Sequence, residues 1–573
     1  MKALRVLARQ AVLYSMCCRL GWPQSGLSQL SEDFWRWRAQ EQPFSEDDIP
    51  RLEKPLGLPI DWSRQSIQQK RLQLGAFEGR WKNLAPGDGA AISQQVDYRL
   101  TGSALARVHW ELDIEQGWKR NPLFYVDQTL GAMYLLLLPA PPFEASRQAE
   151  IVHRLETVPA TIHAAKANLT DMREPFARLA IDALENLPER MKTMREALAP
   201  HLSNETKAAL AKAADAAVEA LDDYRQWLRQ GQPKMRRDTA IGRENYLFFL
   251  RNIAILPHSL EQLLQMSQQE WSRSVAFESL ERTRNANVPA QPLFTTARAQ
   301  IDRERLDEEQ IRFFLEQQQL LTVPGWLKHY RNLLVPPYVL PFEDFGVTDD
   351  LTGPLRLNED GISYIREPRP NLGFFYLSTA KDPRPIVVHE GVPGHYFQLC
   401  LSWANPDPIR RHYYDSIANE GIGFYAEEMM LQAGLFDNSP RTRETIYSFM
   451  RLRALRVEAD VKLATGVFSI EQAADYLAKT VPMDAKTALA EAALFSSAPG
   501  QAISYQIGKI QIMNLLADAR RAEGDHFSLR KFHDFVWSNG NVPVSLQRWQ
   551  LLGDKSEVPP PLSPKQAEAI RYP

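Results

Sequence analysis

The segment from His389 to His395 reads HEGVPGH and contains the residue types of a metal-dependent hydrolase. Zinc enzymes commonly pair two histidines one helical turn apart with a glutamate directly after the first. Here the histidines are six residues apart, which is about 600° of helical rotation, so an unbroken helix would separate the two rings. The glycines and the proline between them permit a break. We therefore expect a zinc-binding helix with a two-residue insertion, and Glu390 as the general base.

A third metal ligand is expected from the segment 419–428, which reads NEGIGFYAEE and opens a predicted helix. Glu420 is followed by a glycine, which would let a metal ion approach closely. His412 is an alternative third ligand, and Cys400 is a soft ligand by type, although a buried apolar cysteine is the commoner case. Glu427 lies two turns after Glu420 on the same face, where its carboxylate could orient a histidine through the second ring nitrogen. Adjacent glutamates are otherwise typical of a solvated helix face.

A further candidate lies in the segment 498–508, which reads APGQAISYQIG. Tyr505 follows a glycine-containing turn, and its hydroxyl could donate a hydrogen bond to the oxyanion that develops during hydrolysis. A tyrosine taken alone is more often a packing residue. Arg451, Arg453 and Arg456 lie between the candidate segments, where they would bind a substrate carboxylate or form a solvated helix face.

The elements that must position these residues are mostly helices. Apolar residues recur three and four positions apart over residues 145–230, with further helical patterns at 257–285 and 298–321 and from 387 to about 539. Prolines exclude long helices between about 335 and 388. The sequence predicts a mainly α fold with a small β-sheet next to the active-site helix.

Two short runs are expected to form this sheet: Ile362–Ile365 and Phe374–Leu377. The strand around Phe374–Ser378 would pair with an extended peptide substrate, which makes Tyr376 a candidate substrate-binding residue.

Length and charge limit the domain organisation and the classes of ligand that this chain could have. The chain has 573 residues, a net charge of −3 and a pI near 6.5. Its length indicates an N-terminal helical region over 1–240 and a catalytic region over 241–573, or one continuous fold from about 30 to 560. The charge balance favours neither nucleic acid nor an anionic membrane surface, and no window approaches the ~18 apolar residues of a membrane span. A peptide or small-molecule substrate fits better, and nothing in the sequence indicates the oligomeric state.

The cysteines and the N-terminus bear on localisation. Three cysteines, two of them adjacent, are typical of a reducing compartment and favour the cytoplasm. Basic residues from Lys2 to Arg9 precede a short apolar run that is broken at Ser15 and closes at Arg19 without a clear cleavage site. We interpret this segment as a first amphipathic helix; an export signal, and hence a periplasmic protein, is the alternative.

Four segments resemble successive blocks of the DUF885 family: HEGVPGHYFQ, NEGIGFYAEE, APGQAISYQIG and KFHDFVWSNGNVPV. The first block is the most specific, and weaker similarity begins near Asp33, so the resemblance covers most of the chain. The family comprises largely helical bacterial proteins grouped with the zinc metallopeptidases whose third ligand is a glutamate (gluzincin type). The resemblance implies a zinc-peptidase-like fold, ligands at His389, His395 and Glu420, and a general base at Glu390.

The chain departs from the family pattern at two positions. Ile422 stands where the second block usually has tryptophan, which would alter the wall of a pocket. Ala464 stands where the family tends to have a histidine, four residues after the aspartate that matches Asp460. His533, in the fourth block, is retained and would either face substrate or serve a structural role.

The hypothesis that follows is metal-assisted hydrolysis of a peptide or other amide bond, with one Zn²⁺ or another divalent ion. The alternative is a catalytically inactive or non-enzymatic ligand-binding protein on a metallopeptidase-like scaffold, because a fold does not establish a function.

Overall fold

The computed structural model describes residues 26–44, 52–59, 61–87 and 89–560. The described chain is mainly helical with one small sheet, as the sequence predicted. The N-terminal segment that we expected to form an amphipathic helix or an export signal lies outside the described residues.

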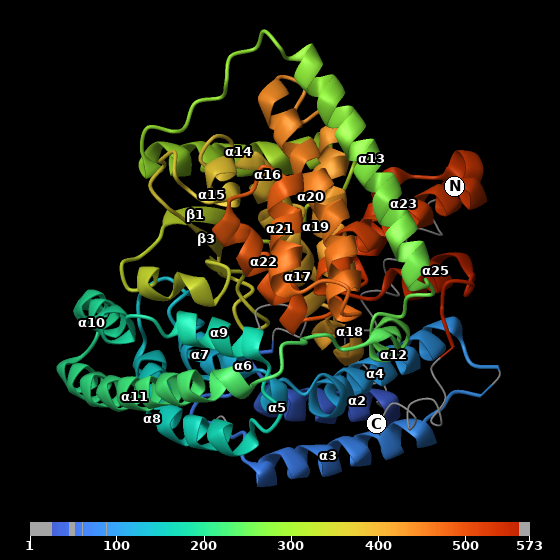
Figure 1. The fold of residues 1–573 in the computed structure, drawn as a ribbon. Coiled ribbons are helices and arrows are strands. Elements are labelled where there is room, and N and C mark those ends of the chain that lie inside the picture. The colour runs from blue at the N-terminus through green and yellow to red at the C-terminus, as the bar shows by residue number, and fades with distance from the viewer. Residues whose placement is uncertain (1–25, 45–51, 60, 88, 561–573) are drawn as a thin grey trace.

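One half of the molecule is built from the helices that precede residue 232, drawn in blue to green at the bottom of Figure 1. The long α8 and α11 pack against each other, and Ser203 begins α11 by accepting a hydrogen bond from the N–H of Thr206. The elements are α2 (Gly26–Glu41), α3 (Arg64–Asn83), α4 (Ile92–His109), η1 (Trp110–Glu115), α5 (Gly117–Arg120), α6 (Pro122–Val126), η2 (Asp127–Gly131), α7 (Ala132–Tyr134), α8 (Ala145–Asn168), α9 (Glu174–Ala183), α10 (Leu187–Leu198), η3 (Ala199–His201) and α11 (Asn204–Gly231).

The middle of the chain joins this half to the site. The helical patterns at 257–285 and 298–321 correspond to α13 and α14, and a capping box at Ser259 and Gln262 begins α13. The elements are η4 (Gln232–Lys234), α12 (Arg243–Phe248), η5 (Phe249–Ile253), α13 (Leu260–Arg284), α14 (Ala297–Gln317), β1 (Tyr330–Leu334), η6 (Leu340–Phe345), β2 (Asp349–Asp350) and β3 (Gly361–Ile365).

The C-terminal part is a helical bundle, drawn in yellow to red, and it contains every candidate metal ligand. The elements are α15 (Phe374–Thr379), α16 (Arg384–Ile386), η7 (Val387–Gly391), α17 (His395–Trp403), α18 (Pro408–His412), α19 (Ser416–Gln432), α20 (Pro440–Ala464), α21 (Ile470–Thr480), α22 (Ala485–Ser497), α23 (Gln501–Glu523), η8 (Gly524–His526), α24 (Leu529–Ser538) and α25 (Val544–Leu552).

The small sheet has the strand order β1-β3-β2, with β1 and β3 parallel and β2 antiparallel to β3. It lies against the segment that contains His389 and His395. A β-carbon at Gly391 would lie 2.5 Å from the ring of Tyr330 in β1, and one at Gly361 in β3 would lie 2.6 Å from the ring of Tyr396. The sheet therefore supports both sides of the segment that contains the two histidines.

The predicted strand around Phe374–Ser378 is wrong, because these residues form the short helix α15. The N–H of Leu377 donates to the carbonyl of Gly373, as in a helical turn. The rings of Phe374 and Phe375 pack against Phe449 of α20, with centroids 5.6 and 5.8 Å apart. The aromatic residues that suggested a strand thus fill a contact between helices, since β-propensity depends strongly on tertiary context.

Helices α19 and α23 cross at two glycines. A β-carbon at Gly421 would lie 2.6 Å from the Cα of Gly508, and one at Gly508 would lie 2.0 Å from the carbonyl oxygen of Ile417. No side chain larger than hydrogen fits at this crossing without moving a backbone. The glycines thereby set the distance between the helix that contains Glu420 and the helix that contains Tyr505.

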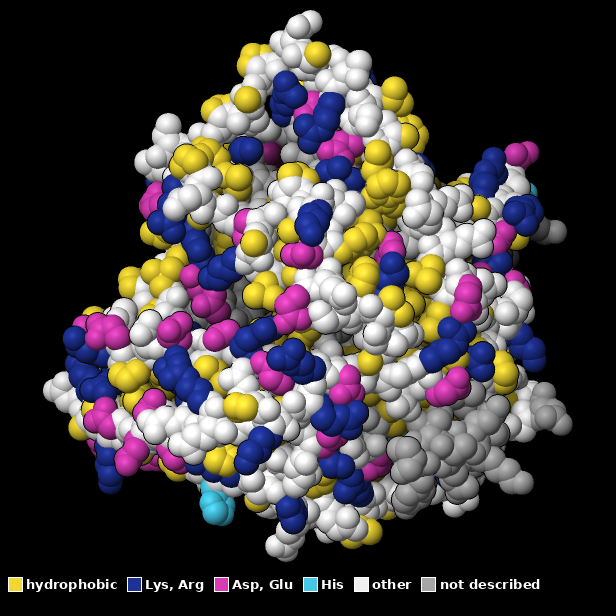
Figure 2. All heavy atoms as spheres, viewed as in Figure 1, with side chains coloured by type: hydrophobic (Ala, Val, Ile, Leu, Met, Phe, Trp, Pro, Cys, Tyr) yellow, Lys and Arg dark blue, Asp and Glu magenta, His cyan; other side chains and the backbone are white. Residues whose placement is uncertain are grey.

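Packing does not separate the chain cleanly at residue 240, since side chains from 335–364 share a core with residues 62–228. Among the described residues, no helix has the length and apolar character needed to cross a membrane. On the face shown in Figure 2, Lys and Arg side chains are interspersed with Asp and Glu.

Gly508→Ala tests the helix crossing. The methyl group would overlap the backbone of α19, so we expect a loss of about 1–3 kcal/mol in the free energy of unfolding, measured by urea denaturation. Gly79→Ala is the matched control, because Gly79 lies in the exposed part of α3 with no atom near its missing β-carbon. It should gain about 0.5–1 kcal/mol. Equal stability of the two variants would contradict the proposed constraint.

Candidate metal centre

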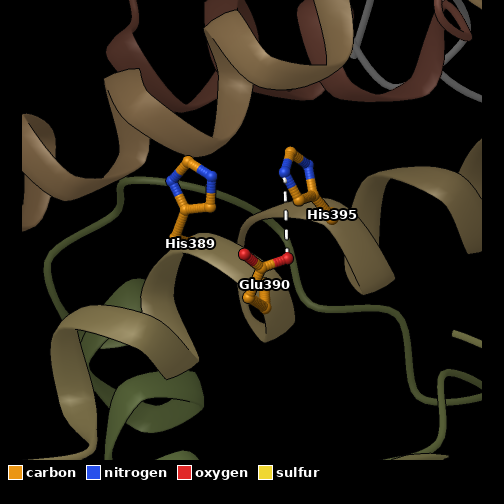
Figure 3. Close-up of side chains that lie close together, drawn as sticks. All are labelled: His389, Glu390 and His395. Atoms are coloured by element: carbon orange, nitrogen blue, oxygen red, sulfur yellow. Dashed lines mark ion pairs between the residues drawn. The ribbon is translucent and has the colours of Figure 1, made fainter. Parts of the chain in front are cut away.

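His389 and His395 lie on two separate helical segments that meet at a break. The π-helical turn η7 ends at Gly391, the backbone of Val392 is extended, and α17 begins at His395. The expected single helix with an insertion is therefore replaced by two short helices that face each other across the break. The imidazole centroids are 4.7 Å apart, and Figure 3 shows both rings with Glu390 beside them.

The break depends on Gly394. A β-carbon there would lie 1.7 Å from the carbonyl oxygen of His389, so the chain folds back on itself as tightly as a backbone can. The carbonyl of Pro393, which the break removes from regular helical pairing, accepts a 2.6 Å hydrogen bond from the indole N–H of Trp537 in α24. The fourth sequence block thus stabilises the first.

Glu420 extends from α19 between the two imidazoles. Its Oε2 lies 3.1 Å from Nε2 of His395 and 3.3 Å from Nε2 of His389. Helix α19 begins after Asp415, whose carboxylate accepts from the N–H of Ala418, and Glu420 falls in the second turn. A β-carbon at Gly423, one turn further, would lie 3.0 Å from Cε1 of each imidazole, so this glycine lets both rings rest on the helix.

The distances from Oε2 of Glu420 to the two imidazoles are close to the ligand spacing of a tetrahedral zinc shell. Ligands at about 2.0–2.2 Å from Zn²⁺ lie about 3.3–3.6 Å from one another in a tetrahedron. The two Nε2–Oε2 distances are 3.3 and 3.1 Å, the second slightly shorter than this range. Two neutral imidazoles and one carboxylate also form the donor set of many catalytic zinc sites. The residues present therefore fit a zinc ion. The same spacing would also suit hydrogen bonds from protonated imidazoles to Glu420. The metal content of the protein distinguishes a bound ion from such hydrogen bonds.

Glu390 completes the group from the solvent side. Ligand atoms of His389, Glu390 and His395 lie within 4.8 Å of one another, and Oε2 of Glu390 is 3.9 Å from Nε2 of His395. Glu420 is the closer carboxylate to both imidazoles, so we assign Glu420 as the ligand. The side chain of Glu390 is 29% exposed whereas that of Glu420 is 6% exposed, so Glu390 is the carboxylate that water can reach.

Glu427 holds the far side of His389. Its Oε1 lies 2.7 Å from Nδ1 of His389, which leaves Nε2 to face Glu420. Burial opposes a charge on His389, but its pairing with Glu420 and Glu427 outweighs burial and raises the pKa of His389 to about 9. Burial likewise disfavours the charged form of Glu420, but His395 and His389 hold the pKa of that carboxyl well below its usual value.

Tyr505 lies beside His389, with the two rings nearly parallel and their centroids 6.1 Å apart. Its helix, α23, is fixed by Asp460 of α20, whose carboxylate accepts hydrogen bonds from the N–H groups of Gly500 and Ile503. Complete burial raises the pKa of Asp460 to about 7. Asp460, which matches the aspartate of the family pattern, therefore positions the helix that contains Tyr505.

The two rival ligands lie elsewhere. His412 packs near Trp35 of α2, with ring centroids 6.3 Å apart, and burial lowers its pKa to about 4. Cys400 is buried, and its Sγ lies 3.8 Å from the hydroxyl of Thr352. Burial raises the pKa of the Cys400 thiol to about 12, which opposes the thiolate that metal binding requires.

Two other candidates make structural contacts. His533 is fully buried; its Nδ1 donates to the carbonyl of Leu320, and its Nε2 accepts from the hydroxyl of Tyr425. Burial lowers the pKa of His533 to about 4. The hydroxyl of Tyr376 is 2.8 Å from that of Thr348. In these arrangements neither side chain is part of the group formed by the histidines and glutamates.

The two departures from the family pattern lie in the core. Ile422 is 1% exposed and packs in the hydrophobic cluster around α17 rather than lining a pocket. Ala464 is the last residue of α20, about 16 Å along the helix axis beyond Arg453. A histidine at that position would not reach His389.

Three residues that the sequence reasoning missed contribute to the site. Gly423 and Trp537 lie inside recognised blocks and could have been singled out by their residue types. Arg453 belongs to the arginine run that was interpreted as a substrate site or a solvated face, but it is 3% exposed and contacts Glu427. Its burial depends on how α20 packs against α19, which the local sequence does not show.

Comparison with known proteins gives one family and two structural relatives. The model of the family described as bacterial protein of unknown function (DUF885) matches residues 57–318 and 364–551. A candidate lipoprotein of unknown function from Shewanella oneidensis has a TM-score of 0.68 at 17% identity, covering 92% of this chain and 100% of the other. A candidate lipoprotein from Colwellia psychrerythraea has a TM-score of 0.68 at 16% identity, covering 92% and 98%. No curated protein matches the sequence. Because the family model covers more than half of the chain, this protein belongs to the DUF885 family.

Proposed function

We propose that this protein is a zinc-dependent hydrolase that cleaves a peptide or another amide bond. The observation that carries the proposal is the convergence of two imidazole Nε2 atoms on one carboxylate oxygen of Glu420, at 3.1 and 3.3 Å, with Glu390 beside them. His389, His395 and Glu420 would hold the ion. Bound Zn²⁺ would supply Lewis acidity and lower the pKa of a coordinated water toward ~7.

Glu390 has the position of a general base. It follows a ligand directly in the sequence, and its side chain is partly exposed. The carboxylate would take a proton from the attacking water and deliver it to the leaving amine. Tyr505, stacked beside His389, would donate from its hydroxyl to the developing oxyanion. A short peptide and a non-peptide amide present the same bond to these groups, so both belong to the proposed substrate class.

The metal assignment rests on the donor set. Two imidazoles and one carboxylate suit zinc, and manganese or cobalt can occupy the same ligands. The buried surroundings of the imidazoles favour a tightly held ion, because the ligand side chains are already ordered by Glu427 and Gly423.

A ligand-binding protein without catalytic activity remains the second candidate. A fold does not establish a function, and the family to which the chain belongs is described as of unknown function. The loss of the family histidine at Ala464 gives this candidate little support, because Ala464 lies in the core at the end of α20.

An exported location is favoured over the cytoplasm that we expected from the cysteine count. Both structural relatives are described as candidate lipoproteins, which are exported proteins, and the alternative interpretation of the N-terminal segment was an export signal.

Metal content tests the proposed ligands. Purified wild-type protein should contain about one equivalent of zinc by inductively coupled plasma mass spectrometry, and His395→Ala should contain about a tenth of that or less. Removing one imidazole leaves too few ligands to retain the ion. His412→Ala is the matched control, since this buried histidine lies near Trp35 and outside the group. Wild-type protein that stays empty after incubation with zinc would contradict the assignment.

Glu390→Gln separates the enzyme from the ligand-binding protein. A general base is needed for proton transfer but not for holding the ion, so the variant should retain zinc and lose about 10²–10⁴-fold in turnover. Turnover would be followed by mass spectrometry on a mixture of short peptides and N-acyl amino acids. If wild type cleaves none of these compounds, or if the variant cleaves them equally well, the catalytic proposal fails.

A further inference from the structure

Arg453 lies behind the metal centre on α20. Its side chain is 4% exposed, so the guanidinium is removed from water. The rings of Phe424, Phe449 and Tyr505 surround it, with centroids 5.1, 5.3 and 5.7 Å from the guanidinium carbon. A charge in such surroundings is costly unless a counter-charge accompanies it.

Glu427 supplies that counter-charge. Nη2 of Arg453 lies 2.8 Å from Oε1 of Glu427, and within the described residues this is the ion pair that Arg453 makes. Nε and Nη1 have no hydrogen-bond partner in the described structure. The electrostatic stabilisation of this buried cation therefore comes mainly from one carboxylate oxygen, together with the faces of the three rings.

The same oxygen of Glu427 contacts His389. Oε1 lies 2.7 Å from Nδ1, while Nη2 of Arg453 is 3.5 Å from the same nitrogen. Oε1 of Glu427 is therefore the closer of these two neighbours of Nδ1. Nε2 of His389 is the ring atom that faces Glu420, at 3.3 Å from its Oε2. The four side chains form one series: Arg453, Glu427, His389, Glu420.

We propose that Arg453 is a positioning residue that fixes the carboxylate of Glu427 and, through it, the ring orientation of His389 at the metal centre. The inference rests on the proposed function, because it takes His389 as a ligand. A carboxylate that oriented a ligand without Arg453 would be free to rotate its two oxygens, whereas the guanidinium holds Oε1 between itself and Nδ1. Partners of this kind typically change metal affinity by 10–100-fold.

Arginine and lysine should differ at this position. The planar guanidinium can stack among three rings while Nη2 pairs with Glu427, and an ammonium group has neither the plane nor the length. Arg453→Lys retains a cation near Glu427 without the geometry, so it should recover part of what Arg453→Met loses. A simple effect of charge would instead make the lysine variant equal to wild type.

Lys509 offers a matched control. It is another fully buried cation, 2.7 Å from Glu428, the residue after Glu427 on the same helix. Glu428 keeps a second partner in Arg273, whose Nη1 and Nη2 lie 2.8 and 3.0 Å from its two oxygens. Lys509→Met therefore removes a buried cation next to α19 without freeing the carboxylate that contacts His389.

The experiment measures Zn²⁺ dissociation constants by competition with a chromophoric chelator, for wild type, Arg453→Met, Arg453→Lys and Lys509→Met. We expect Arg453→Met to bind Zn²⁺ about 10–100-fold more weakly, Arg453→Lys to be intermediate, and Lys509→Met to match wild type. The visible spectrum of the Co²⁺-substituted proteins should change in the same order, since it reports ligand geometry. Circular dichroism checks that each variant is folded.

The outcomes separate this inference from the proposed function. Wild type that binds no zinc contradicts both. Wild type that binds zinc, with Arg453→Met binding equally well, overturns the role of Arg453 alone. An equal loss in Lys509→Met would also overturn it, because any buried cation beside α19 would then have the same effect. Arg453→Lys keeps the test decisive if Arg453→Met does not fold.

Discussion

At Gly394 the chain passes so close to the carbonyl oxygen of His389 that a β-carbon would lie 1.7 Å from it. This backbone contact decides the geometry of the whole centre. Six residues of continuous helix would turn the two imidazoles to different faces, and the contact ends one helix and begins the next so that the rings meet. Gly391 against Tyr330 and Trp537 on the carbonyl of Pro393 stabilise the two sides of the break.

The surroundings of the break are organised by charge. Helix α19 presents two consecutive glutamates to two different pairs of residues. Glu427 contacts His389 and Arg453, and Glu428 contacts Lys509 and Arg273. Buried charges of this kind stabilise a fold only when each is paired, and removing one partner is costly. Because α13, α20 and α23 each contribute a cation to this set, the orientation of α19 is linked to the packing of three other helices.

The sequence was most informative where chemistry is local. The predicted ligands and base come together because HEGVPGH and NEGIGFYAEE are compact motifs, and the distant Glu427 lies on the same helix face as Glu420. The sequence predictions were wrong or incomplete where tertiary contacts determine the secondary structure or the burial of a residue. The run at Phe374 has the composition of a strand, yet its rings pack on α20 and the backbone is helical. Arg453 belongs to an arginine run that is typical of a solvated helix face, yet rings from α19 and α23 cover it.

The candidate metal centre is open to water on the side of Glu390. Glu390 is 29% exposed, whereas the side chains of His389, His395 and Glu420 are 6% exposed or less, and Arg453 and Glu427 are sealed behind them. Protons on the Glu390 carboxylate can therefore exchange with solvent directly. The contact between His389 and Glu427 lies on the closed side, where proton exchange with solvent requires the packing of α19 and α20 to open. In a hydrolase, Glu390 would change its protonation state at every turnover. Glu427, on the closed side, would keep its protonation state from one turnover to the next.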